Sequence, residues 1–185
     1  MISIISDEKR VVLISGNLFV EPELLYSMYR LEEAGVKVTV ATFGKNPIKG
    51  LYGYTINPDF DIASLKVEDF EVFTPSGGSP YELRRDQKTL EFLRGMHKKN
   101  VIASICRGVL LLVSAGIMKG KKTTTWTDVA DDLKNSGVIF EDLAVVKNGN
   151  IVTSRVPSDL PKFLYALIDT IKWVGGSFNA YLCCR

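Results

Sequence analysis

One cysteine stands where a predicted strand meets a predicted helix, a joint that suits thiol chemistry. Cys106 follows the short β-branched run 101–105, which is typical of a buried strand, and precedes an apolar stretch long enough for a packed helix. The sulfur would then sit on a sharp turn above the sheet, as in a nucleophile elbow. The helix N-terminus and Arg107 both favour an anion. We therefore predict a pKa for Cys106 below the ~8.5 of free cysteine, although a small buried core cysteine is the alternative.

Two other predicted strands end beside residues that could contribute to the same site. The strand over 10–15 leads to Glu21 and Glu23 on the first turn of a helix, and the strand over 70–75 leads to Ser76-Gly77-Gly78. Glycines let backbone amides approach a ligand closely. Since reacting groups gather at the carboxyl ends of strands in an open α/β sheet, a carboxyl, an amide loop and a thiol are expected to converge.

The elements that must position these groups alternate between strand and helix. Further strands are predicted over 37–43, 123–125, 143–147 and 151–154, with a weaker one inside 50–58 at the sheet edge. Helices are predicted over 21–35, 86–100, 128–133 and 158–174, and after Cys106. The Asn148-Gly149 pair predicts a hairpin. This alternation predicts an α/β fold whose mostly parallel sheet has helices on both faces.

Composition indicates an ordinary globular protein. The 185 residues are 46% hydrophobic and 24% charged, and we expect one domain over 1–174 followed by a C-terminal tail, 175–185, of unassigned structure. A net charge of +2 gives no case for binding nucleic acid or a membrane surface. No apolar run approaches the ~18 residues of a membrane span, and the N-terminus does not read as a signal peptide. The adjacent Cys183 and Cys184 do not make a disulfide framework, so a cytoplasmic location is expected.

Five short motifs, in order and with family-like spacing between about residues 11 and 171, resemble the ThiJ/PfpI superfamily. This superfamily contains PfpI-type intracellular peptidases and the Parkinson-associated deglycase. The resemblance implies a flavodoxin-like three-layer sandwich with a nucleophile elbow. The motifs are E-L-L-Y with Y-R-L from Glu23, G-G with E-L-R from Gly77, A-S-I-C-R-G from Ala103, S-A-G-I-M-K-G from Ser114, and T-S-R with P and D-L-P from Thr153.

Carried onto this chain, the resemblance makes Cys106 the nucleophile and Glu23 the acid that hydrogen-bonds its sulfur. A carboxyl facing a thiolate in a poorly hydrated pocket should be protonated, so that it can donate to sulfur and later exchange a proton with substrate. The backbone amides of Gly78 and Arg107 would form an oxyanion hole. The alternative for Glu23 is a first-turn acid that complements the helix dipole, a role that suits Glu21 better. Neither a metal nor another cofactor is implied.

Two departures from the family pattern weaken a peptidase reading. PfpI-type members have histidine directly after the cysteine, where this chain has Arg107, and another branch has a histidine where this chain has Trp126. Arginine stays charged and cannot deprotonate a thiol. The single histidine, His97, falls at the end of a predicted helix, where a solvated role is expected. Trp126 is expected to form a pocket wall or part of the core.

The function that fits is a glyoxalase- or deglycase-like enzyme acting on a small reactive carbonyl or a glycated substrate. A PfpI-like peptidase is the alternative enzyme, and a redox-responsive or chaperone-like stress protein that uses oxidation of Cys106 is an alternative of another class. The resemblance also implies a homodimer or higher oligomer. In it, Glu82 of one subunit would pair with Arg107 of another at the rim of the Cys106 pocket.

Overall fold

The computed structural model describes residues 10–70, 72–75 and 78–174 of the chain. Its main sheet has the strand order β10-β11-β7-β6-β1-β2-β5, and all neighbouring strands are parallel except β10 and β11. The five central parallel strands, taken in chain order, give the flavodoxin-like order 2-1-3-4-5. The strands are β1 (Arg10–Ile14), β2 (Lys37–Thr42), β5 (Phe60–Asp61), β6 (Val72–Pro75), β7 (Val101–Ile105), β10 (Val145–Asn148) and β11 (Ile151–Ser154).

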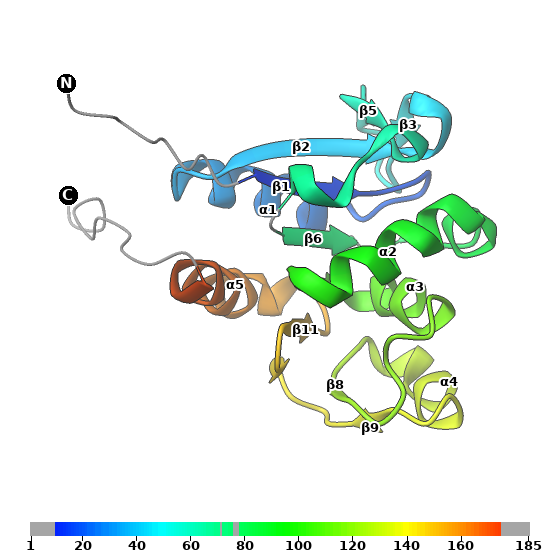
Figure 1. The fold of residues 1–185 in the computed structure, drawn as a ribbon, viewed down its shortest axis with the longest axis vertical. Coiled ribbons are helices and arrows are strands. Elements are labelled where there is room, and N and C mark those ends of the chain that lie inside the picture. Colours follow the sequence, from blue (N-terminus) through cyan, green and yellow to red (C-terminus); the bar gives the residue numbers. More distant parts are fainter. Residues whose placement is uncertain (1–9, 71, 76–77, 175–185) are drawn as a thin grey trace.

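Helices cover both faces of this sheet, which confirms the predicted three-layer architecture (Figure 1). Helices α1 (Glu21–Glu33) and α5 (Leu160–Val174) pack on one face, and α2 (Gln87–Lys99) and α3 (Val109–Ser114) pack on the other. After the exposed Arg10, strand β1 is apolar because both of its faces are buried: Val11 and Leu13 face the first layer, while Val12 and Ile14 face the second. A parallel strand buried on both faces has no polar side to alternate with.

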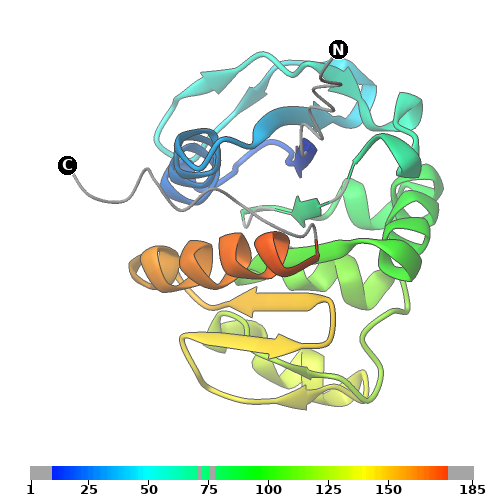
Figure 2. The ribbon, with the colours of Figure 1, turned by 60° about the vertical axis from the view of Figure 1, so that its left-hand side comes forward.

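Short elements complete the edges. The hairpin predicted at Asn148-Gly149 joins β10 to β11, with Gly149 at a φ of 62°. Helix α4 (Ala130–Asn135) lies near the small parallel sheet of β8 (Lys122–Thr123) and β9 (Ile139–Phe140) (Figure 2). The other short elements are 3-10 turns at Phe43–Lys45, Ile62–Ser64, Val67–Asp69, Leu83–Arg85, Cys106–Gly108, Thr127–Val129 and Pro157–Asp159.

The strand predicted inside 50–58 was placed wrongly. Strand β4 (Thr55–Ile56) pairs with β3 (Ile48–Lys49) in a separate two-stranded antiparallel sheet, while β5 forms that edge of the main sheet. The turn between β3 and β4 is tied instead to the start of α1, because the Glu21 carboxylate accepts hydrogen bonds from the amides of Tyr52 (2.7 Å) and Tyr54 (3.4 Å).

The candidate site residues lie at the edge of the sheet where the parallel strands end. Each parallel strand runs toward the edge where α1, the Gly78 loop and Cys106 begin, so the candidate chemistry gathers there. The predicted tail, 175–185, with Cys183 and Cys184, lies outside the described residues. Within the described part of the chain, no helix is both long enough and apolar enough to cross a membrane.

Candidate active site

Cys106 occupies a strained turn directly after β7. Its φ of 55° lies in the left-handed region, which costs an L-residue about 1–2 kcal/mol. Two features hold the turn in place: a short 3-10 turn leads into α3, and the Thr125 hydroxyl donates a 2.7 Å hydrogen bond to the Cys106 carbonyl. The cysteine is 7% exposed. The backbone therefore has the geometry of a nucleophile elbow, and the sulfur is close to the surface without being open to it.

Glu23 reaches the cysteine from a different element. It lies in the first turn of α1, is 1% exposed, and forms a side-chain hydrogen bond with Cys106. The contact exists because β1 and β7 end at the same edge of the sheet, and α1 starts directly above that edge. Glu21, two residues earlier in the same turn, accepts hydrogen bonds from the backbone amides of Tyr52 and Tyr54 instead. The two acids therefore have separate surroundings.

The predicted low pKa of Cys106 is wrong in direction. Burial, and next the negative charge of Glu23, raise the pKa of the Cys106 thiol to about 12, against the opposing effects of the Arg107 amide and the Arg107 charge. Desolvation penalises the anion more than the short 3-10 turn and one cation favour it. The contribution of Glu23 depends on its ionisation, so the thiol and the carboxyl titrate as a coupled pair.

Arg107 contacts the cysteine through its backbone and a tryptophan through its side chain. Its amide bonds the Cys106 sulfur, and its Cζ lies 5.2 Å from the centroid of the Trp126 ring. This distance is within the range of a cation–π contact. The Nε atom is buried and has no hydrogen-bond acceptor, and none of the ion pairs in the described part of the chain includes Arg107.

Gly78 brings the loop after β6 against the loop after β1. Its φ is 101°, and a Cβ at this position would lie 2.6 Å from the Cα of Phe19 and closer still to the carbonyl oxygen of Leu18. Only glycine fits such an approach. Ser76 and Gly77, the other residues of the predicted amide loop, lie outside the described residues.

Glu82 is exposed and is not joined to Arg107 within one protomer. It lies on the wall of a cleft of about 600 Å³ that also includes Asn17, Phe43 and Arg85. The sequence prediction places its partner on another subunit, so this arrangement leaves that prediction open to experiment.

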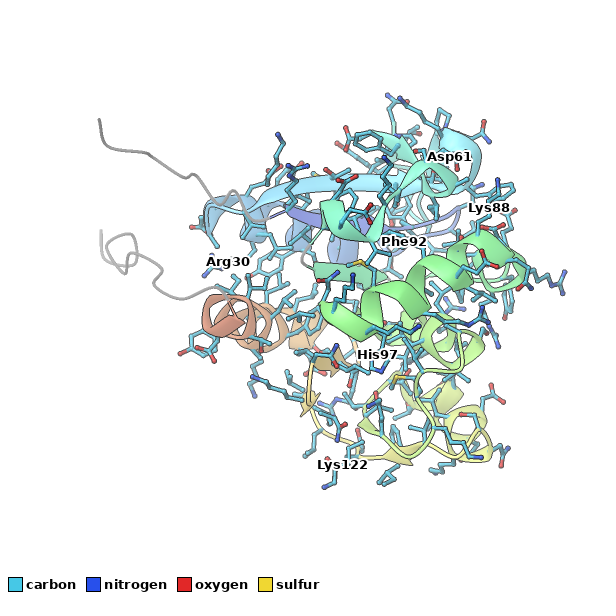
Figure 3. The ribbon with its side chains drawn as sticks, viewed as in Figure 1. Arg30, Asp61, Lys88, Phe92, His97 and Lys122 are labelled. Carbon is cyan, nitrogen blue, oxygen red and sulfur yellow. The ribbon has the colours of Figure 1, made fainter. Side chains whose placement is uncertain are left out.

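His97 lies far from the cysteine. It is near the end of α2 (Figure 3), before β7, whereas Cys106 follows β7. Five strand residues, about 16 Å, separate the two ends. His97 is half-buried, which departs from the solvated role expected for it, and burial followed by the charge of Lys121 lowers its pKa.

Two sets of supporting contacts had little or no signal in the sequence. Thr125, which holds the Cys106 carbonyl, is 19 residues from it in sequence. Arg155 pairs with Asp159 (2.9 Å) and Asp142 (2.8 Å), which fixes the chain just after β11 at the same edge of the sheet. The motif T-S-R was the only signal for Arg155, and no local pattern indicated Thr125. Among the described residues, no cluster of three or more His, Cys, Asp or Glu side chains could hold a metal.

Comparison with known proteins identifies the family of this chain. The DJ-1/PfpI family model matches residues 9–170, so the chain belongs to the DJ-1/PfpI family. A deglycase of Pyrococcus abyssi is 36% identical over 165 residues, covering 88% of this chain and 99% of that protein. A Bacillus subtilis protein, provisionally named the cysteine protease YraA, is 31% identical over 168 residues, covering 89% and 99%. Drosophila melanogaster DJ-1beta has a TM-score of 0.81 at 26% identity, covering 92% of this chain and all of that one.

Proposed function

We propose that this protein is a cysteine-dependent enzyme of the glyoxalase or deglycase type, which acts on 2-oxoaldehydes or their adducts with amines. Cys106 is the nucleophile and Glu23 moves the protons. The observation that carries the proposal is the hydrogen bond between these two side chains on a turn where Cys106 has a φ of 55°. The name of the Pyrococcus abyssi relative, a deglycase, supports the same class of substrate.

A raised thiol pKa is compatible with this role, because the proton does not have to leave the site. Transfer of a proton from Cys106 to an ionised Glu23 gives a thiolate and a neutral carboxyl, and the net charge of the pair stays unchanged. The neutral carboxyl then donates a hydrogen bond to sulfur. The strained turn keeps the two groups in contact, so that the exchange needs no rearrangement of the chain.

The reaction balances with these two groups and one water. Sulfur adds to the aldehyde carbon, and the resulting oxyanion takes a proton to give a hemithioacetal. Glu23 removes the proton on that carbon and returns it to the neighbouring ketone carbon, while the proton of the hemithioacetal hydroxyl passes to the former ketone oxygen. A thioester of a 2-hydroxyacid is left. Water cleaves the carbon–sulfur bond, releasing the hydroxyacid and restoring the thiol. The amides of Gly78 and Arg107 are the proposed donors to the oxyanion.

Peptide hydrolysis fits the site less well. The leaving amine must receive a proton from a positioned acid, which in Cys–His peptidases is the imidazole. The only histidine of this chain lies at the opposite end of β7, and the residue after the cysteine is Arg107. The provisional name of the Bacillus subtilis relative keeps the peptidase reading as the alternative to be tested.

The test compares wild type with Cys106→Ser on three substrates: methylglyoxal, a glycated peptide and casein. We expect wild type, but not Cys106→Ser, to consume methylglyoxal and form lactate. Casein should stay intact with both proteins. Cleavage of casein that disappears in the variant would establish the peptidase instead. A wild-type protein that consumes none of the three substrates would overturn the proposal.

Glu23→Gln separates the enzyme from a redox-responsive protein. Removing the proton carrier should lower the turnover of methylglyoxal by about 10²- to 10⁴-fold. Oxidation of Cys106 by peroxide, followed by the mass of its peptide, needs no proton transfer between carbons and should continue. Equal turnover in wild type and Glu23→Gln would remove Glu23 from the mechanism.

A further inference from the structure

Arg107 is a cation beside the proposed nucleophile, with no carboxylate partner among the described residues of its own chain. No ion pair in the described part of the chain includes it, and its buried Nε has no hydrogen-bond acceptor. Leaving a buried charged donor unpaired is costly, so native structures rarely do so without a reason. Arg155, at the same edge of the sheet, has two carboxylate partners, Asp142 and Asp159. At this edge, one arginine therefore has carboxylate partners within the chain, and Arg107 has none among the described residues.

The guanidinium is also held in place. Its Cζ lies 5.2 Å from the centroid of the Trp126 ring, while its backbone amide bonds the Cys106 sulfur. A guanidinium that is stacked on a ring loses little further freedom when a ligand binds. It presents planar N–H donors that match the two oxygens of a carboxylate. The guanidinium of Arg107 is therefore held in place, lacks a carboxylate partner within the described part of the chain and lies near the sulfur. These are the properties of a cation that binds an anionic ligand.

We propose that Arg107 selects substrates that carry a carboxylate, so that the preferred substrates are acidic 2-oxoaldehydes rather than neutral ones. This inference rests on the proposed function, since the aldehyde carbon must reach Cys106 while the carboxylate reaches Arg107. A single guanidinium suits a singly charged carboxylate. A suitable probe is 4,5-dioxopentanoate, in which two methylene groups separate the ketone from the carboxylate.

The chemistry of this probe is the same isomerisation and hydrolysis. Sulfur adds to the aldehyde carbon, the proton on that carbon moves to the ketone carbon, and water releases 2-hydroxypentanedioate. Methylglyoxal follows the same steps to lactate. The two substrates differ only in the group on the ketone, a methyl group against a chain that ends in a carboxylate. The change in the ratio of their kcat/KM values between wild type and a variant therefore measures the contribution of the substituted residue to selection of the carboxylate.

The first experiment measures this ratio, 4,5-dioxopentanoate over methylglyoxal, in wild type, Arg107→Gln and Arg30→Gln. Arg30 lies in the last turn of α1, seven residues or about 10 Å along the helix from Glu23, so its variant removes the same charge from a distant position. The ratio should fall about 10- to 100-fold in Arg107→Gln and stay near the wild-type value in Arg30→Gln. A wild-type preference for methylglyoxal, or an equal change in both variants, would overturn the inference.

A second experiment does not depend on turnover. The rate of alkylation of Cys106 is measured with iodoacetate and with iodoacetamide, which differ in charge, by the mass of the peptide that contains Cys106. The rate ratio of iodoacetate over iodoacetamide should exceed that of a free thiol in wild type and in Arg30→Gln. It should drop in Arg107→Gln, and Arg107→Lys should keep part of it. If wild type turns over neither aldehyde, the proposed function fails while this ratio still decides the role of Arg107. A ratio unaffected by Arg107→Gln contradicts that role.

Discussion

Cys106 and Glu23 are two acids that face each other where water has little access, with exposed fractions of 7% and 1%. Two negative charges at hydrogen-bond distance repel each other, so the pair loses its protons one at a time. In the proposed mechanism, the reactive form is the one in which the remaining proton lies on the carboxyl. The population of this form depends on the difference in proton affinity between the thiol and the carboxyl, not on the pKa of the thiol alone.

Glu23→Gln should therefore make Cys106 less reactive at neutral pH. Burial, the largest cause of the raised thiol pKa, remains in the variant, but the thiol proton can no longer pass to a carboxyl. We expect alkylation by iodoacetamide at pH 7 to slow, and its rate to depend more steeply on pH. Glu32→Gln, an exposed change of equal charge on the same helix, is the control. Faster alkylation in Glu23→Gln would mean that the charge of Glu23 outweighs its role as proton acceptor.

The raised pKa of Cys106 also predicts how stability depends on pH. A thiol whose pKa rises from an ordinary 9.0 to about 12 on folding binds its proton more tightly in the folded state. Its contribution is complete below pH 9.0 and is lost as the pH rises toward 12. Between these values, the free energy of unfolding should decline less in Cys106→Ala than in wild type. Parallel declines in urea titrations from pH 8.5 to 10.5 would contradict this linkage.

Among the turns, Gly78 is the position where a side chain should do the most damage. Gly78→Ala adds a Cβ against the backbone of Leu18 and Phe19 as well as strain at a φ of 101°. We expect a loss of about 2–4 kcal/mol in the free energy of unfolding. Gly116→Ala is a matched control, because its φ is 74° and no atom lies within 4 Å of the added Cβ, so that it should lose only about 1–2 kcal/mol. Equal losses in thermal or urea unfolding would show that the close approach carries no cost.

How far sequence could predict the elements depended on their length and on what they pack against. Strands β1 and β7 and helices α1, α2 and α5 were confirmed within a few residues, because long apolar runs and helical periodicity reflect burial directly. Strand β5 was missed and β4 was assigned to the wrong sheet, since pairs of residues have no periodicity and their partners are set by tertiary contacts.

The candidate site shows the same contrast between features with a local sequence pattern and features set by tertiary contacts. The positions of Cys106, Glu23 and Gly78 in the fold could be predicted because each follows a strand that is clear in the sequence. The stacking of Arg107 on Trp126 and the bond from Thr125 join residues 19 apart across separate elements, and only the folded chain brings them together. The thiol pKa was predicted in the wrong direction because the depth of burial is a property of the packed layers, not of one turn.

At the scale of the whole molecule, the sheet joins two hydrophobic layers to one edge that carries the candidate site. Residues that alternate along β1 enter the cores on opposite faces, and the strand ends then carry the loops of the site. Asn150, at the hairpin, donates hydrogen bonds to the carbonyls of His97 (3.0 Å) and Asn100 (2.6 Å) at the opposite edge. The edge with Asn150 is therefore held by hydrogen bonds. The edge with the candidate site includes two charged side chains, Glu82 and Arg107, that have no ion-pair partner among the described residues of the protomer.

Two of those charges lead to a prediction about assembly. Glu82 is exposed, Arg107 is half-buried, and neither has an ion-pair partner among the described residues of one chain. We propose that Glu82 of one subunit pairs with Arg107 of another in a homodimer or higher oligomer. A guanidinium has five N–H donors in a fixed fork, so some of them can meet Glu82 while others remain for a substrate carboxylate. Glu82→Ala and Arg107→Ala should both weaken the oligomer in sedimentation, by about 3–5 kcal/mol if the pair is buried. Arg30→Gln should leave assembly intact, and unchanged sedimentation of both pair variants would count against the intersubunit contact.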